Sequence, residues 1–303
     1  MTDGVTVDLA ELINLQRFAR PIRYRPDQRA ARSGHHLSNR RGRGMDFSEV
    51  RNYQAGDEIR HMEWRMTART GKPHIKLYQE ERERPVVLVT DFNPSMHFGT
   101  RIAFKSVIAA RLTALLAWTV VKQGDCVGGL FFSASEHHEY MPRSREAGVL
   151  TLLTTLSQYT QTPPSQNTPT RSLLHALKRL NRVARPGSTL VLISDFYQLD
   201  RECALLLARL RQHNDLLAYH ICDPLELSPP KPQRYAISNG EEECLLDIRN
   251  STMSDAYQHD CDERLARIKK HCLDLQIQRV QIAPTDDLSR VIHNTFPGRA
   301  YAT

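Results

Sequence analysis

The 303-residue sequence lacks any apolar run long enough to cross a membrane. Its longest strongly apolar stretch, residues 112–121, spans ten residues, which is about half of a membrane-spanning helix. The N-terminal segment 5–15 contains Asp8 and Glu11, so it cannot serve as the apolar region of a signal peptide. These absences predict a cytoplasmic protein that has no membrane partner.

Cysteine is scarce, and the usual catalytic motifs are missing. The chain has six cysteines, no two of which lie at the spacing of a zinc site, so we expect reduced thiols. The sequence has no glycine-rich phosphate loop, no HExxH motif and no Ser-His-Asp order. These absences argue against the common enzyme classes and against a small-molecule substrate.

Positive charge is present in excess and is concentrated near the N-terminus. The formal net charge is +7, and residues 17–44 contain nine arginines against a single acid, Asp27. Such an arm can bind the phosphates of a nucleic acid, bind an acidic face of another protein, or simply be solvated. Only Phe18 and Tyr24 could stack on bases there, which argues against sequence-specific binding of single strands. Nucleic-acid binding through the arm stays open as an alternative function.

From residue 85 onward, apolar strands alternate with helices. We expect strands at 86–90, 127–132, 139–141, 189–193, 216–222 and 277–282, and helices at 101–123, 145–158, 171–184, 201–212, 254–274 and 286–295. This alternation predicts an α/β fold with a doubly wound, mostly parallel sheet that has helices on both faces.

The chain divides into two expected parts. Residues 1–80 contain an amphipathic helix at 5–18, the arginine-rich arm and a segment that ends in a strand at 73–78. Residues 81–303 form the α/β domain, with a β-hairpin insertion near 234–248 around Asn239-Gly240.

Oxygen-bearing side chains follow the apolar strands at the points where they end. Asp91, Asn93 and Ser95 alternate just past the first strand, Asp195 follows a later one, and Asp223 is a third, weaker case. The carboxyl ends of parallel strands line one edge of a sheet, where ligands bind, and hard cations prefer oxygen ligands. The pattern predicts a metal site, although acids at strand ends can also simply cap the helices that follow.

Two groups of motifs resemble a known family. The run from Asp91 to Ser95, with Ser194-Asp195 after a later strand, resembles the metal-ion-dependent adhesion site of von Willebrand factor A domains. The upstream signature consists of Gly42–Phe47, Arg51–Tyr53, Gly56–Arg60, Glu63-Trp64, Thr67–Arg69 and Glu80-Glu81. Together these motifs resemble the bacterial family called domain of unknown function fifty-eight, over residues 34 to 225. The resemblance implies a von Willebrand factor A-like domain preceded by an N-terminal family-specific segment.

The resemblance also implies a ligand set and a cofactor. The implied metal ligands are Asp91, Asn93, Ser95, Thr168 or Thr170, and Asp195. Asn93 stands where the family usually has serine, and its amide oxygen can still coordinate magnesium. Alignment on Ala176-Leu177 alone would place Arg171 at the position of the threonine. The implied cofactor is Mg²⁺, with Mn²⁺ as a substitute.

The partner implied by the resemblance is another protein. Family members are usually encoded beside MoxR-type AAA+ ATPases and are thought to act as their metal-binding adaptors. We therefore expect a non-enzymatic adaptor or co-chaperone that grips an acidic residue of the ATPase or of its client. The candidate partner-binding residues of the upstream signature are Arg51, Asp57, Arg60, Trp64 and Arg69. A purely structural role for this segment stays open.

A metal-dependent phosphohydrolase is the enzymatic alternative. An aspartate after the first strand is also how haloacid-dehalogenase-type enzymes place their nucleophile, and Asp91 has this position. Those enzymes use a second aspartate two residues later as acid and base, whereas this chain has Asn93 there. A neutral amide cannot shuttle the proton, so we favour the binding module.

Overall fold

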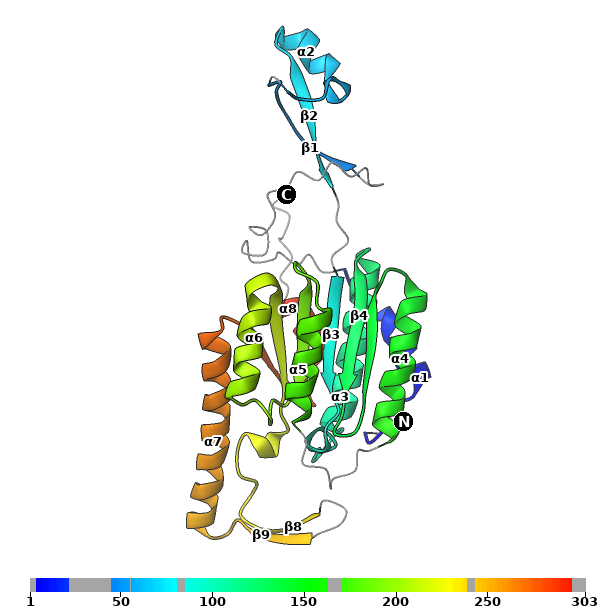
Figure 1. Cartoon of the computed structure of the whole chain (residues 1–303). Helices are drawn as coiled ribbons and strands as arrows, with labels where there is room; N and C mark the ends of the chain where they lie inside the picture. The colour runs from blue at the N-terminus through cyan, green and yellow to red at the C-terminus, as the bar shows by residue number, and fades with distance from the viewer. Residues whose placement is uncertain are drawn as a thin grey trace. The chain divides into compact units, whose positions relative to one another are not determined.

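The computed structural model describes residues 4–21, 45–54, 56–80, 85–162, 171–238 and 243–295 (Figure 1). Most of the arginine-rich arm, Thr168, Thr170 and the hairpin tip Asn239-Gly240 lie outside the described residues. In the described part of the chain, no helix combines the length and the apolar character that a membrane span requires. The chain forms two compact units, one of residues 34–83 and a main unit of the remaining residues.

In its described residues, the smaller unit contains two strands and two short helical segments. They are β1 (Met45–Asn52), a 3-10 turn at Ile59–His61, α2 (Trp64–Thr70) and β2 (His74–Glu80). The two strands pair antiparallel. Glu63 caps α2 by accepting the backbone N–H of Arg65 and pairs with Lys76 of β2. Gly71 ends the helix with φ of 69°, a left-handed conformation that glycine adopts without strain.

The main unit is built on one six-stranded sheet. Its strands are β3 (Pro85–Asp91), β4 (Cys126–Phe132), β5 (His137–Arg143), β6 (Thr189–Ser194), β7 (Asp215–Ile221) and β10 (Gln278–Ile282). The spatial order is β10-β7-β6-β3-β4-β5, with every neighbouring pair parallel except β4 and β5. This is the doubly wound order 3-2-1-4-5-6 with an antiparallel edge strand, and it confirms the expected fold class.

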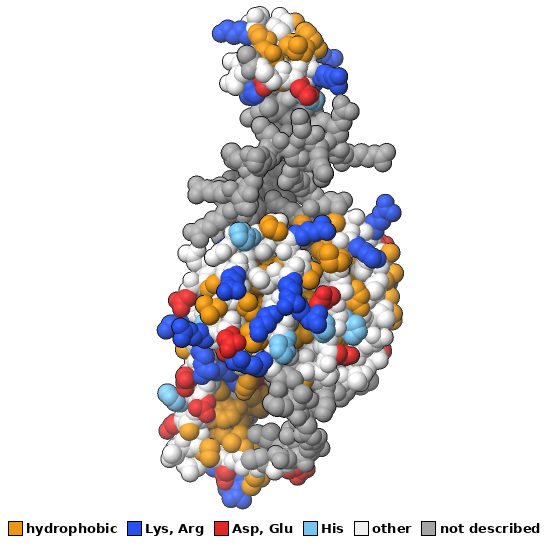
Figure 2. Space-filling view, in the orientation of Figure 1, with side chains coloured by type: hydrophobic (Ala, Val, Ile, Leu, Met, Phe, Trp, Pro, Cys, Tyr) orange, Lys and Arg blue, Asp and Glu red, His pale blue; other side chains and the backbone are white. Residues whose placement is uncertain are grey.

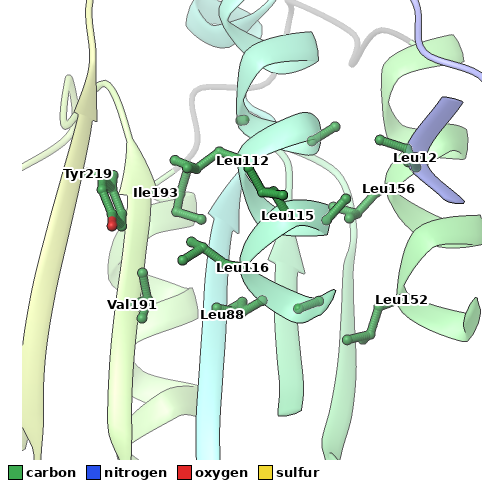
Figure 3. Close-up of a cluster of buried hydrophobic side chains, with 14 of the residues drawn as sticks. Leu12, Leu88, Leu112, Leu115, Leu116, Leu152, Leu156, Val191, Ile193 and Tyr219 are labelled. Carbon is green, nitrogen blue, oxygen red and sulfur yellow. The ribbon is translucent and has the colours of Figure 1, made fainter. Parts of the chain in front are cut away.

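Helices cover both faces of this sheet (Figure 1). They are α1 (Leu9–Asn14), α3 (Lys105–Lys122), α4 (Glu146–Gln161), α5 (Ser172–Val183), α6 (Arg201–His213), α7 (Ser251–Asp274) and α8 (Leu288–Thr295). One core forms between the sheet and α1, α3, α4 and α8, and the other between the sheet and α5, α6 and α7. In Figure 3, Leu88 and Ile193 of the strands face Leu112 and Leu116 of α3. Successive residues of a strand point to opposite faces, so Leu88 enters the first core and Val87 the second.

The N-terminal helix belongs to the main unit, which differs from the expected boundary at residue 80. Leu12 of α1 is completely buried, and its carbonyl accepts a hydrogen bond from Nε1 of Trp118 at 3.1 Å. The backbone of Val7 is bonded to Ser157 and Thr160 of α4. The apolar face of α1 therefore finds its partner on α3 and α4 and not in the segment that follows it.

The described residues include a hairpin at the position of the expected insertion. Strands β8 (Arg234–Ser238) and β9 (Glu243–Asp247) pair antiparallel between β7 and α7. The switch point of the sheet lies between β3 and β6, where the strand order reverses direction. Ligands of open α/β sheets bind outside the carboxyl ends of the strands at such a point.

Candidate functional site

Two buried carboxylates lie at the switch point. Asp91 is the last residue of β3, and Asp195 directly follows β6, which is its neighbour in the sheet. Each is only 3% exposed. Oδ2 of Asp91 accepts a hydrogen bond from Oγ of Ser194 at 2.7 Å, and the backbone N–H of Phe196 donates to that same hydroxyl at 2.8 Å. The two strand ends are therefore joined directly through side chains.

Asn93 holds the other oxygen of Asp91. Its backbone N–H and its Nδ2 donate to Oδ1 of Asp91 at 2.9 and 2.6 Å. Its Oδ1 accepts from Oγ of Ser172 at 2.6 Å, at the first residue of α5. Ser95 lies on the same turn, and its hydroxyl acts to lower the pKa of Asp195. The structure thus brings Asp91, Asn93, Ser95 and Asp195 together, as the sequence predicted.

Lys105 is the functional residue that the sequence analysis missed. It is the first residue of α3, and its side chain is completely buried. Its Nζ lies 2.8 Å from Oδ2 of Asp195 and 2.6 Å from Oε1 of Glu226. The rings of Phe98 and Tyr197 lie 6.0 and 5.9 Å from the ammonium, within the range of a cation–π contact. The available signal was a lysine at the start of a mostly apolar helix, in which Arg111 and Lys122 are the other charged residues.

Glu226 reaches Lys105 because a capping motif fixes the turn after β7. Asp223 caps this 3-10 turn, Pro224–Glu226, and accepts the backbone N–H of Leu225 at 3.0 Å. In return, Oε2 of Glu226 accepts the N–H of Asp223 at 2.9 Å, which leaves Oε1 for the lysine. Asp223 also accepts two hydrogen bonds from Thr100. The third strand-end acid is therefore a structural cap.

The two carboxylates of the switch point differ in their electrostatics. Burial, followed by the charge of Asp195, raises the pKa of Asp91 to about 7, against the opposing hydrogen bonds from Ser194 and Asn93. Burial also acts to raise the pKa of Asp195, but the charge and hydrogen bond of Lys105 outweigh it and the pKa is lowered. The same pairing, with Asp195 and Glu226, raises the pKa of Lys105 despite its burial. Asp195 and Lys105 are consequently an ionised pair.

Of the remaining candidates for the metal loop, the structure describes Arg171. Thr168 and Thr170 lie outside the described residues. The Arg171 side chain is 59% exposed and pairs with Asp200 at 3.0 Å and Glu202 at 3.1 Å. Its neighbour Ser172 is the residue that contacts Asn93.

The donor set of the switch point does not fit a divalent ion in this arrangement. The Lys105 ammonium contacts Asp195, and the Asn93 amide donates to Asp91, so cationic or N–H groups face both carboxylates. Among the described residues, no three His, Cys, Asp or Glu side chains are grouped so as to hold a metal. Binding of Mg²⁺ or Mn²⁺ therefore stays a prediction.

A groove opens beside this cluster. It has a volume of about 410 Å³ and is lined by Arg171, Leu174, residues 197–201, Arg267 and His271. Arg264 connects the groove to the cluster. Its guanidinium lies 4.8 Å from the ring of Tyr197, which lines the groove, and donates to the carbonyl of Glu226, which belongs to the cluster, at 2.8 Å. Figure 2 shows several Lys and Arg side chains on the face of the main unit that carries α5 and α6.

The candidate partner-binding residues of the upstream signature lie in the smaller unit. Arg51 and Asp57 form an ion pair at 2.8 Å, and Asp57 also accepts the backbone N–H of Gln54 at 2.8 Å. These two side chains hold a turn. Arg60 and Arg69 are exposed, and Trp64 is 66% exposed. The side chains of the first two residues are therefore paired with each other, and those of the other three are exposed on the smaller unit.

Comparison with known proteins assigns the family. Residues 49–269 match the family described as Protein of unknown function DUF58, and the chain belongs to it. It is 30% identical over 197 residues to the uncharacterized proteins Mb1516 of Mycobacterium bovis and Rv1480 of Mycobacterium tuberculosis. The match covers 65% of this chain and 61% of each mycobacterial protein, so the chain spans less than two thirds of these relatives.

Solved structures with a similar arrangement are more distant. The conserved hypothetical protein BatB from Bacteroides thetaiotaomicron is 13% identical with a TM-score of 0.40, covering 70% of this chain and 96% of that chain. An aerotolerance-related membrane protein from Bacteroides fragilis is 14% identical with a TM-score of 0.41, at the same coverages of 70% and 96%.

Proposed function

We propose that this protein is a non-enzymatic protein-interaction module, an adaptor or co-chaperone partner of a MoxR-type AAA+ ATPase. In this proposal it binds an acidic segment of the ATPase or of its client at the carboxyl edge of the main sheet. The observation that carries the proposal is the groove beside the buried switch-point cluster, whose charged lining consists of three arginines and one acid: Arg171, Arg201, Arg267 and Asp200. Arg171 and Arg267 also pair with acids of the chain, so Arg201 is the groove arginine best placed to bind a partner. A surface of this charge favours acidic partners and speeds their association.

The geometry of Asp91 supports a binding role over phosphohydrolase chemistry. A nucleophilic carboxylate needs an oxygen that can reach the substrate. Both oxygens of Asp91 accept hydrogen bonds from Ser194 and Asn93, and the residue is 3% exposed. Asn93 also fills the position at which such enzymes use their acid and base.

The metal-dependent form of the proposal has a separate test. If Mg²⁺ bridges the protein to a partner carboxylate, Asp91→Ala should abolish partner binding in magnesium. Unchanged binding of Asp91→Ala would exclude the metal bridge while leaving the groove as the binding surface.

The groove is tested by reversing one charge in it. Arg201 is exposed at the start of α6 and lines the groove, whereas Arg209 is exposed on the same helix outside it. We expect Arg201→Glu to weaken binding of the purified ATPase by roughly tenfold or more, because it removes an attraction and adds a repulsion. Arg209→Glu should bind as the wild type does. Titration calorimetry or surface plasmon resonance measures both, and equal affinity of the two variants would contradict the proposed surface.

A further inference from the structure

The most unusual group of the molecule is the buried ammonium at the switch point. The side chain of Lys105 is completely buried, and its Nζ has carboxylate oxygens at 2.8 and 2.6 Å. A lysine charge is expensive to bury unless it is paired. Asp195 and Glu226 supply that pairing, and the rings of Phe98 and Tyr197 add two aromatic faces.

The location of this ammonium conflicts with a metal at the same acids. A divalent ion held by Asp195 would have to share that carboxylate with the lysine, at a distance where two positive charges repel strongly in a low dielectric. Asp91 faces a different competition, from a neutral donor, since Nδ2 of Asn93 already lies 2.6 Å from its Oδ1. Both carboxylates are satisfied by groups of the chain itself.

The same contacts join three loops at the edge of the sheet. Lys105 lies at the start of α3, where its backbone N–H also bonds the carbonyl of Phe98 at 2.8 Å. Asp195 begins the segment after β6, and Glu226 ends the turn after β7. In a metal-containing site, one bound cation connects such loops because each loop supplies it with an oxygen ligand.

We infer that the ammonium of Lys105 takes the place of a divalent ion at the switch point, so that the edge is assembled without metal. Lys105 is then a positioning residue, which holds the segments after β6 and β7 beside the groove. This inference concerns the resident cation alone and does not rest on the identity of the partner.

The test compares cation binding and thermal stability without any partner. The wild type should keep its melting temperature in millimolar Mg²⁺, in Mn²⁺ and in chelator, and should bind no Mn²⁺ by electron paramagnetic resonance. Lys105→Met should melt roughly 5 to 10 °C lower, because it leaves Asp195 and Glu226 without their counter-ion. Mg²⁺ or Mn²⁺ should restore part of that loss by entering the vacated place. Lys178→Met, which alters an exposed lysine of α5, should change nothing.

Several results would overturn the inference. One is Mn²⁺ bound by the wild type and lost in Asp91→Ala. A second is a melting temperature of Lys105→Met equal to that of Lys178→Met. A third is a destabilised Lys105→Met that gains nothing from either ion, because the vacated place would then not accept a cation. If Lys105→Met does not fold, Mn²⁺ binding by the wild type decides the question alone. None of these experiments measures ATPase binding, so failure here is distinguishable from failure of the proposed function.

Discussion

The side chain of Asn93 makes two hydrogen bonds that connect different elements at the switch point. Its amide carries both a donor and an acceptor, which contact Asp91 and Ser172 at the same time. The serine that the resemblance implies at this position also has one donor and acceptor capacity, but both belong to a single atom of a shorter side chain, whereas the amide carries its donor and its acceptor on two separate atoms. Asn93 thereby links the end of β3 to the start of α5 within the chain itself.

His220 is a buried histidine that makes the free energy of unfolding depend on pH. It is 2% exposed in β7, with its ring beside Cys222 and Arg279. Burial, followed by the charge of Arg279, lowers the pKa of His220 from 6.5 to about 4. Between these values the unfolded chain binds a proton that the folded chain does not, so the free energy of unfolding falls as the pH falls.

We predict that His220→Leu removes part of this acid sensitivity. A pKa shift of this size lowers the free energy of unfolding by about 3 kcal/mol as the pH falls from 6.5 to 4. Urea unfolding at pH 7, 5.5 and 4.5 should give a shallower pH slope for His220→Leu than for the wild type. His213→Leu, at an exposed position of α6, should keep the wild-type slope. A slope unchanged in His220→Leu would show that this histidine is not held neutral.

At the scale of elements, α1 is held to the main unit by a few specific contacts. Leu12 is completely buried, and Trp118 of α3 binds its carbonyl. Arg111 of α3 also pairs with Glu11 of α1. The helix has only six residues, too few to be stable alone, so its order depends on these tertiary contacts.

Leu12→Ala should therefore destabilise the main unit. Removing a completely buried leucine side chain leaves a cavity and costs about 3 kcal/mol. Leu205→Ala is the matched control, because Leu205 is 58% exposed on α6 and its truncation should stay within about 0.5 kcal/mol. Thermal unfolding measures both, and equal melting temperatures would contradict the packing of α1.

Sequence reasoning located the acids at the strand ends but missed their counter-ion. Asp91 and Asp195 were predictable because each follows an apolar run, and parallel strands end at one edge. Lys105 was not, because it falls within a segment expected to be helical from residue 101, where a lysine in the first turns is ordinarily solvated. Its burial depends on Glu226, which lies 121 positions away along the chain. No local pattern encodes that contact.

The structure differs from the sequence-based expectations at two other places, the start of α5 and the helix α2. Arg171 was a candidate for the metal loop, yet the contact with Asn93 comes from Ser172, one residue further on. The exposed partners Asp200 and Glu202 draw the arginine away from the site. In the smaller unit, β2 was predicted, but α2 is too short and too polar to leave a helical period in the sequence.

At the scale of the whole molecule, the family match includes parts of both units, since residues 49–269 begin in β1 and end in α7. The main unit has a groove lined by three arginines and one acid beside a charge-paired edge, and the smaller unit exposes Trp64 with neighbouring arginines. In the proposed function, the groove receives the acidic segment, and the smaller unit is free to add a second contact. Aromatic and arginine side chains are the residues that most often dominate such interfaces.

The most direct test of the central claim is amide hydrogen exchange of the wild-type chain, free and with saturating MoxR-type ATPase. Docking at the carboxyl edge predicts slower exchange in residues 197–201 and 267–271, which line the groove. The hairpin β8–β9, which does not line the groove, should exchange as it does in the free protein. Protection confined to that hairpin or to the smaller unit, with the groove unchanged, would contradict binding at the edge of the main sheet.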